Sequence, residues 1–503
     1  MKNIIIYKIL TYINLIKNSN FLKILISFFY NIFIINGYYI FKGDNDMEKD
    51  ILNDKKSGWL NIDNSIKENV FNFCDKYIDF LNNCKTERET TKYIVSKLEN
   101  NGFKNIDNIN NINENKVYMI NHDKSVYVAI IGSDNIKNGV NIIGAHIDSP
   151  RLDLKPNPLY EDAKLALFKT HYYGGIKKYQ WTTIPLAIHG VIVRTDGKKI
   201  SITIGEDEYD PIFTITDILP HLSQKQYEKK IDEAIKGEDL NVLIGSIPNQ
   251  DESIKENIMN IINEKYNIKE IDFTSSELEV VPAFKAKSLG FDKSMIAAYG
   301  QDDRVCSYCA LQALIDAKEN KKTIVAIFSD KEEIGSVGNT GMCSNVFDLF
   351  MYKILELKKE NITGVLNQTY CNSVMLSADV GAGVDPNYQS VSEKNNASFI
   401  GYGVELNKYT GSKGKSGASD ANAEFVANIR RIFESNNIKY QVSELGKVDI
   451  GGGGTIAYIL ANKGIDVIDC GVPVISMHSP YEVTSKFDVY CAYQAYKAFY
   501  DNA

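Results

Sequence analysis

Apolar segments of the strand type alternate with helical segments through most of this chain of 503 residues. We interpret five segments as strands and two as helices between the later strands: strands at 126–132, 139–145, 323–329, 373–379 and 466–471, helices at 304–317 and 416–433. Two more helices are expected before the first strands, over 65–84 and from the capping-box pair Thr86 and Glu89. This alternation predicts an α/β fold with a parallel or mixed sheet.

The middle of the chain breaks the alternation. Between residues 155 and 288, short β-like runs such as PLAIHGVIVRT and KKISITIG are separated by turn residues, with one charged helical insert near 224–236. We therefore predict an inserted, mainly β domain over 155–288. The segments 47–154 and 289–503 then form the two parts of one α/β domain.

The first 46 residues need a separate interpretation. An apolar run at 24–41 lies between Lys23 and Lys42 and is just long enough for a membrane span or an uncleaved signal anchor. It contains Asn31, Asn36 and Gly37, however, and the sequence from residue 47 onward is typical of a soluble domain. We predict that 1–46 is an extension outside the fold, with a membrane anchor as the alternative.

Composition excludes some classes of function. The formal net charge of −8, without any run rich in Lys and Arg, argues against nucleic-acid binding. Eight cysteines in so long a chain favour a reducing cytoplasm. The one CxxC pair, Cys306 and Cys309, lies in an apolar helical run, and we expect it to serve packing rather than redox or metal chemistry.

Five short segments place a histidine or a carboxylate where an apolar strand ends: IIGAHIDSP, AYGQDDRV, FSDKEEIGS, LSADVGAG and ISMHSPYE. Their candidate ligands are His146, Asp148, Asp302, Asp303, Glu332, Glu333, Asp379 and His478. The carboxyl ends of strands in an open α/β sheet converge on one crevice. Two divalent metals need imidazole nitrogens, carboxylates and one carboxylate that bridges the ions, and this set supplies them.

Each of these signals alone has an ordinary structural explanation. Adjacent acidic residues usually form a solvated face, and we interpret His122, His171 and His189 as structural histidines. GGGG at 451–454 lacks the context of a phosphate-binding loop. The hypothesis of a metal site depends on the conjunction of several acidic loops with apolar strands in a chain that has only six histidines.

The segments GAHIDSPRLDLKP, QDDRVCSYCALQALID, DKEEIGS, SADVGAGVDPNY and MHSPYE closely resemble the aspartyl aminopeptidase family of cytosolic metallopeptidases. The resemblance extends from about Trp59 to the C-terminus. It implies a mixed-sheet zinc exopeptidase domain in which His146 and Asp379 bind one metal, Glu333 and His478 bind the other, and Asp302 bridges both. It also implies Glu332 as the general base and Asp148 as the residue that orients His146.

The same resemblance implies a quaternary structure. The inserted domain would join subunits into dimers, and the dimers would assemble into a tetrahedral dodecamer whose internal chamber admits short peptides. His221, in the segment DILPHLSQ, resembles the histidine that family members present across the dimer interface to the neighbouring active site. There it would donate a hydrogen bond to the oxyanion and contact the substrate.

The expected substrate pocket departs from the family pattern. Members that prefer acidic N-terminal residues carry a Lys and an additional His near this pocket, where this chain has Glu405 and Asp385. We therefore expect a preference for neutral or basic N-terminal residues, with Lys408 and Lys413 as alternative sources of positive charge. Met477, beside the predicted ligand His478, is also expected to contact the substrate.

The predicted function is hydrolysis of the N-terminal residue of short peptides by a cytoplasmic metalloaminopeptidase with two bridged divalent metals. Zinc is the expected metal, with manganese or cobalt as alternatives, because sites of His and carboxylate accept all three. The alternative functions are a catalytically inactive scaffold or receptor with the same fold, and a two-metal amide deacylase. An inactive relative should have lost Glu332, Asp302 or a liganding histidine, and this chain retains them.

Overall fold

The computed structural model describes residues 55–109, 114–318, 321–360 and 364–502, and the features below belong to the unit Lys56–Ala503. The predicted extension at 1–46, with its apolar run, lies outside the described residues. Within the described ranges, none of the helices combines the length and the apolar character that crossing a bilayer requires.

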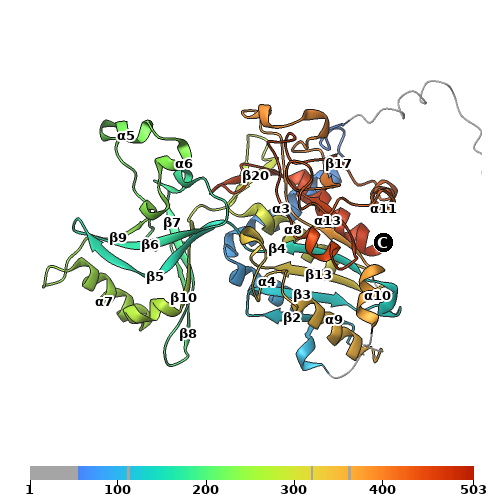
Figure 1. The fold of residues 1–503 in the computed structure, drawn as a ribbon, viewed down its shortest axis with the longest axis horizontal. Coiled ribbons are helices and arrows are strands. Elements are labelled where there is room, and N and C mark those ends of the chain that lie inside the picture. The colour runs from blue at the N-terminus through green and yellow to red at the C-terminus, as the bar shows by residue number, and fades with distance from the viewer. Residues whose placement is uncertain (1–54, 110–113, 319–320, 361–363, 503) are drawn as a thin grey trace, which may run out of the picture. The chain divides into compact units, whose positions relative to one another are not determined.

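A nine-stranded mixed sheet forms the centre of the fold (Figure 1). Its strands, in spatial order, are β1 (Lys104–Asn105), β2 (Lys116–Asn121), β3 (Ser125–Ile130), β13 (Ile324–Ser329), β4 (Asn141–His146), β14 (Val374–Ser377), β18 (Asp466–Gly471), β16 (Val404–Asn407) and β17 (Tyr440–Ser443). Strands β13, β4, β14 and β18 run parallel, whereas β3 pairs with β13 in the antiparallel direction. The predicted α/β fold with a mixed sheet is confirmed, and the carboxyl ends of β13, β4 and β14 lie at one edge.

Helices cover both faces of this sheet. Alternate residues of β3 belong to different hydrophobic clusters, because successive side chains of a strand point to opposite faces: Val126 and Val128 to one, Tyr127 and Ala129 to the other. The first cluster includes residues of α3 (Asn64–Asn83), α4 (Glu87–Asn100), α8 (Gln301–Ile315), α11 (Ala423–Ser435) and α13 (Lys486–Asn502). The second includes residues of α9 (Val346–Leu357), α10 (Val365–Cys371) and α12 (Ala457–Ala461).

The structure confirms the predicted capping box but shifts the start of one predicted helix. The capping box at the start of α4 is confirmed, because the Thr86 hydroxyl accepts from the Glu89 N–H and the Glu89 carboxylate accepts from the Thr86 N–H. Cys306 and Cys309 are buried in α8 as free thiols, in keeping with the packing role expected for them. The helix expected at 416–433 begins later, at Ala423.

A second, antiparallel sheet is built from the chain between Arg151 and Pro282 (Figure 1, cyan to green). Its order is β8 (Lys199–Ile204), β7 (Leu186–Val193), β10 (Ser276–Pro282), β5 (Arg151–Asp162), β6 (Leu165–Tyr173) and β9 (Val242–Gly245). Helix α7 (Ile254–Tyr266) packs on β5 and β6, and residues of this region form a hydrophobic cluster of their own.

The helical insert predicted near 224–236 is wrong as a single helix. This segment forms two short helices, α5 (Gln224–Tyr227) and α6 (Ile231–Ala234), and neither buries a residue. A short helix depends on burial of an apolar face for its stability, which explains why no longer helix forms here. The longer helix α7 was not predicted, although Ile254, Ile258 and Ile262 recur at helical spacing and Ser253 caps its N-terminus.

A five-stranded sheet joins the loops at the edge of the central sheet. Its order is β11 (Lys287–Leu289), β12 (Met295–Ala298), β20 (Glu482–Ser485), β19 (Pro473–Ile475) and β15 (Gly381–Ala382). Strand β12 precedes Asp302, β15 follows Asp379, and β19 and β20 flank His478. Pairing of these strands therefore brings three predicted metal-binding loops together.

Candidate metal centre

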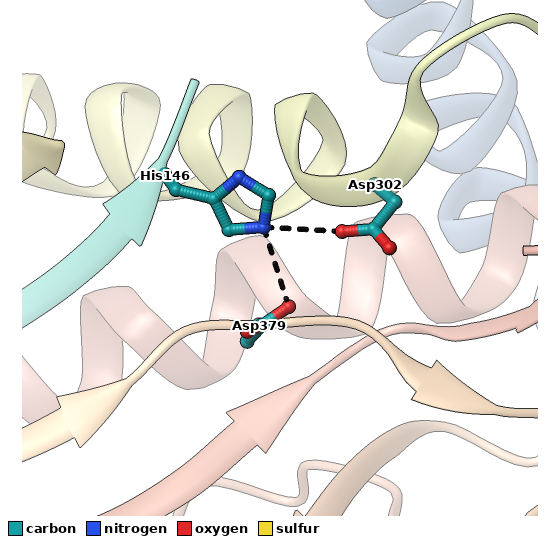
Figure 2. A group of neighbouring side chains, drawn as sticks. All are labelled: His146, Asp302 and Asp379. Atoms are coloured by element: carbon teal, nitrogen blue, oxygen red, sulfur yellow. Dashed lines mark ion pairs between the residues drawn. The ribbon is translucent and has the colours of Figure 1, made fainter. Parts of the chain in front are cut away.

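The first group of side chains consists of His146, Asp302 and Asp379 (Figure 2). His146 is the last residue of β4, Asp302 lies at the start of α8, and Asp379 follows β14. The Nε2 atom of His146 is 3.1 Å from Asp302 Oδ1 and 3.7 Å from Asp379 Oδ1. Figure 2 shows both carboxylates turned toward this nitrogen.

A second group, Asp302, Glu333 and His478, lies on the other side of Asp302. The Nε2 atom of His478 is 3.2 Å from Asp302 Oδ2 and 3.4 Å from Glu333 Oε2. Glu333 belongs to the 3₁₀ turn Glu332–Ile334 after β13, and His478 has a left-handed backbone with φ of 64°. The two oxygens of Asp302 thus face different imidazoles, so one carboxylate is shared by the two groups.

Glu332 lies beside the first group. Its Oε2 atom is 3.9 Å from His146 Nε2, and its carboxylate can join His146 and Glu333 in a third group of potential ligands. Burial raises the pKa of Glu332 to about 8; His146 opposes this shift, whereas Asp379 and Asp302 add to it. Its position beside His146 and its raised pKa make Glu332 a candidate for proton transfer.

The pKa shifts of the potential ligands indicate whether the cluster could hold divalent cations. Burial raises the pKa of Glu333 and of Asp379 above their usual ranges. Burial lowers the pKa of each imidazole, but the surrounding carboxylates outweigh it and the net shift is upward, to about 10 for His478. Protons thus compensate an excess of buried negative charge, and a divalent cation could replace them.

One buried oxygen of this cluster, Glu333 Oε1, has no hydrogen-bond partner among the described residues. Buried polar atoms normally have a hydrogen-bond partner, so this oxygen is available to bind a cation. Imidazole nitrogens and carboxylate oxygens are ligands that zinc, manganese and cobalt accept. The residues therefore fit divalent metal ions.

Asp148 connects the first group to the turn that carries Glu332 and Glu333. Its backbone carbonyl and its Oδ1 atom lie 3.0 and 3.3 Å from His146 Nδ1. Its two carboxylate oxygens accept from the N–H groups of Glu332, at 3.1 Å, and Glu333, at 3.2 Å. The hydroxyl of Tyr173, a residue that was not identified from the sequence, also donates to Asp148 Oδ2 at 2.9 Å.

Glu482 is a second residue that was not identified from the sequence. It accepts from the backbone N–H groups of His478, at 2.7 Å, and Asp302, at 3.1 Å, and so braces two potential ligands. Glu482 is part of the segment MHSPYE. The sequence alone does not show whether such a glutamate would bind a metal or would accept hydrogen bonds from the backbone of neighbouring ligands. Asp303 is fully buried, and its Oδ2 atom accepts from the backbone N–H of His146 rather than joining the potential ligands.

Glu405 does not line an open pocket. It lies in β16, is 1% exposed, and accepts a hydrogen bond of 2.6 Å from Ser443 Oγ. A Cβ atom added to Gly381 would lie 2.0 Å from its carboxylate, so the backbone of β15 closes directly over it. An enclosed carboxylate cannot contact a substrate side chain, and the predicted contact by Glu405 is wrong.

The other predicted substrate contacts lie outside the two groups. Asp385 is half-buried and accepts from the N–H of Asn387 at 2.8 Å, within its own turn. Met477 is half-buried and packs against the hydrophobic core. His221 is exposed in the 3₁₀ turn Pro220–Leu222. Their substrate contacts stay predictions.

Comparison with known proteins places this geometry in a family. Residues 80–500 match the model of the aminopeptidase I zinc metalloproteases, M18. The chain belongs to the M18 family. A "Probable M18 family aminopeptidase 1" of Clostridium acetobutylicum is 50% identical over 465 residues, which cover 91% of this chain and 100% of the relative.

Solved structures of M18 enzymes agree with this assignment. The crystal structure of the M18 aminopeptidase from Thermotoga maritima is 45% identical, covers 90% of this chain and 100% of its own, and has a TM-score of 0.87. That of aminopeptidase I from Clostridium acetobutylicum is 46% identical with the same coverage and a TM-score of 0.84. This M18 chain is therefore an aminopeptidase, a hydrolase of the zinc metalloprotease type.

Proposed function

We propose that this M18 aminopeptidase removes N-terminal residues of short peptides with two divalent cations. His146 and Asp379 would hold one cation, Glu333 and His478 the other, and Asp302 both. The observation that carries this proposal is the placement of the two Asp302 oxygens, 3.1 Å from one imidazole nitrogen and 3.2 Å from the other. Zinc is the proposed metal, with manganese or cobalt as alternatives.

The chemistry divides between the ions and the protein. Bound divalent cations supply Lewis-acid activation of the scissile carbonyl and of the attacking water. Glu332 takes the proton of that water and delivers it to the leaving amine, a role that suits a carboxylate beside His146 and Glu333. Asp148 keeps the base in place, because it accepts from the N–H of Glu332 and also contacts the His146 ring.

The proposed two-ion stoichiometry is tested by elemental analysis of the purified protein after dialysis against limiting zinc. Two equivalents per chain support the proposal, and a single equivalent at saturation contradicts it. A panel of aminoacyl reporter substrates then tests the proposed preference for neutral or basic N-terminal residues. Because Glu405 is enclosed, the proposed preference depends on Asp385. Faster cleavage of Asp or Glu reporters than of neutral or basic ones would show that the proposed preference is wrong.

We further propose that the segment 155–288 joins subunits into dimers and that the dimers form a tetrahedral dodecamer in the cytoplasm. Large apolar side chains are exposed over 212–231, namely Ile212, Ile218, Leu219, Leu222, Tyr227 and Ile231, as expected for an interaction surface. His221 lies among them. A solved S. cerevisiae mApe1 dodecamer shares the fold at 21% identity and a TM-score of 0.69.

A further inference from the structure

The end of strand β6 in the second sheet lies against the metal centre. Tyr173 is the last residue of β6, and Gly174 and Gly175 follow it. Tyr173 contacts Asp148, which in turn contacts His146 of the first group, whereas Gly174 and Gly175 lie directly against Glu333 and His478 of the second group. None of residues 173–175 was identified from the sequence, because their chemistry is a phenol and two backbone units in a region remote from the acidic loops.

The first contact is made by the Tyr173 hydroxyl. It donates to Asp148 Oδ2 at 2.9 Å, and the other oxygen of the same carboxylate lies 3.3 Å from His146 Nδ1. Tyr173 is therefore one residue removed from the imidazole that faces Asp302 and Asp379. Hydrogen bonds of this kind set the orientation and basicity of metal-binding groups.

Tyr173 is itself held in place. The guanidinium of Arg151 lies 3.9 Å from the centre of the Tyr173 ring. Arg151 is buried, and carboxylates of Glu87, Asp153 and Glu279 lie 3.4, 2.8 and 3.1 Å from its nitrogens. Stacking on a guanidinium with fixed charge partners leaves the phenol little freedom to turn its hydroxyl away.

The second contact is made by the backbone of Gly175. Its carbonyl oxygen lies 2.8 Å from Nδ1 of His478. A carbonyl can only accept, so Nδ1 of His478 carries the proton and Nε2, the atom that faces Asp302 and Glu333, is left to bind a cation. The same segment thus orients a potential ligand of the second group.

Gly174 allows this close approach. Its φ is 73°, and a Cβ atom added there would lie 3.3 Å from Glu333 Cβ and 3.4 Å from Pro150 Cβ. A side chain at this position would be strained and would press against Glu333. Glycine therefore lets the segment pass directly over a potential ligand.

We propose that residues 173–175 of the inserted sheet form a positioning element for both cations, in which Tyr173 orients His146 through Asp148 and Gly175 orients His478 directly. The proposal deepens the proposed two-ion function and rests on it. It implies that the second sheet is part of the metal centre and does more than join subunits.

The test compares Tyr173→Phe with Tyr172→Phe, a matched control at the adjacent position of β6, where Tyr172 is 43% exposed. Both variants keep an aromatic ring, and the phenyl ring of Tyr173→Phe would retain the stack on Arg151. Stepwise affinity for Co²⁺ is measured by competition with a chromophoric chelator, together with the absorption spectrum of the Co²⁺-loaded protein.

We expect Tyr173→Phe to bind one of the two cations about 10–100-fold more weakly and to change the cobalt spectrum, with the melting temperature of the metal-free protein unchanged. Tyr172→Phe should match the wild type. Equal affinities and equal spectra for Tyr173→Phe and the wild type would overturn the role of the hydroxyl.

Gly174→Ala tests the segment independently of the phenol. It should weaken binding of the other cation, because the added methyl group presses on Glu333 and shifts the carbonyl that orients His478. Unchanged binding of both cations in Gly174→Ala would overturn the role of the backbone. A wild-type protein that binds a single Co²⁺ contradicts the proposed function itself, and that failure is distinguishable from failure of the variants.

Discussion

Asp302 contributes a carboxylate oxygen to each of the two groups of potential ligands. Replacement by Ala removes an oxygen from each group and leaves His146 and His478 without the carboxylate that they share. We expect Asp302→Ala to lose both bound metals and nearly all peptidase activity, measured by elemental analysis and with an aminoacyl reporter. Full occupancy of two metals in this variant would contradict the shared role of Asp302.

Glu332 should behave differently, because its proposed role is proton transfer. The Gln side chain is nearly isosteric with Glu but cannot take a proton from water. We expect Glu332→Gln to keep its metal content and to lose about 10²–10⁴-fold in turnover. Turnover within a few-fold of the wild type, at equal metal content, would remove Glu332 from this role.

The sequence was sufficient to predict the potential metal ligands, but not the residues that hydrogen-bond to them. His146, Asp302, Glu333, Asp379 and His478 were predicted because each follows an apolar strand or opens a helix after one, and parallel strands end at a common edge. Tyr173 and Glu482 were missed because their contacts come from tertiary pairing of distant strands. The predicted substrate contact of Glu405 was wrong for the same reason. The sequence does not show that the backbone of β15 covers the side of β16 on which Glu405 lies.

At the scale of elements, the hydrophobic period identified the central strands and half of the helices around them, but not α9, α10, α12 or α13. It failed at α5 and α6, where charged sequence with helical propensity has no apolar surface to cover. The pairing of β12, β15, β19 and β20 into one sheet could not be predicted either, because these strands are short and join segments far apart in the chain. That sheet is what brings Asp302, Asp379 and His478 together.

A buried histidine connects β7 of the second sheet to α4. His189 lies 2.8 Å from Glu89 Oε1 and 3.1 Å from Glu206 Oε1, and Lys85 and Lys285 also pair with Glu206. Burial lowers the pKa of His189, but its hydrogen bonds to the two carboxylates outweigh burial and raise the pKa above 6.5. Protonated His189 therefore stabilises the folded state.

The sign of the pH dependence follows from this raised pKa. The stabilising contribution is complete below the unfolded value of about 6.5 and is lost as pH rises through the folded value. We expect His189→Gln to lower the free energy of unfolding by about 1.5–3 kcal/mol at pH 6, and by less at pH 9, measured by denaturant titration. A deficit that grows with pH would contradict the protonated state.

At the scale of the whole molecule, His221 tests whether a subunit is complete alone. His221 is exposed among apolar side chains, as expected for a residue that contacts the active site of a neighbouring subunit. We expect His221→Ala to lose about 10²–10³-fold in turnover with unchanged metal content, as for loss of an oxyanion donor. Mixing it with Glu332→Gln under subunit exchange should restore part of the activity, because some sites then combine an intact Glu332 with an intact His221.

The control for this experiment is the mass of the mixed assemblies. If mixed oligomers form and recover no activity, His221 acts within its own subunit or only supports an interface. If His221→Ala alone retains full turnover, the predicted oxyanion contact is wrong.

The central claim is that two cations share Asp302, and anomalous diffraction from crystals of the zinc-loaded protein tests it most directly. We predict two anomalous peaks per chain, one contacted by His146 and Asp379, the other by Glu333 and His478, with an oxygen of Asp302 at each. A single peak, or two peaks that do not share Asp302, would contradict it.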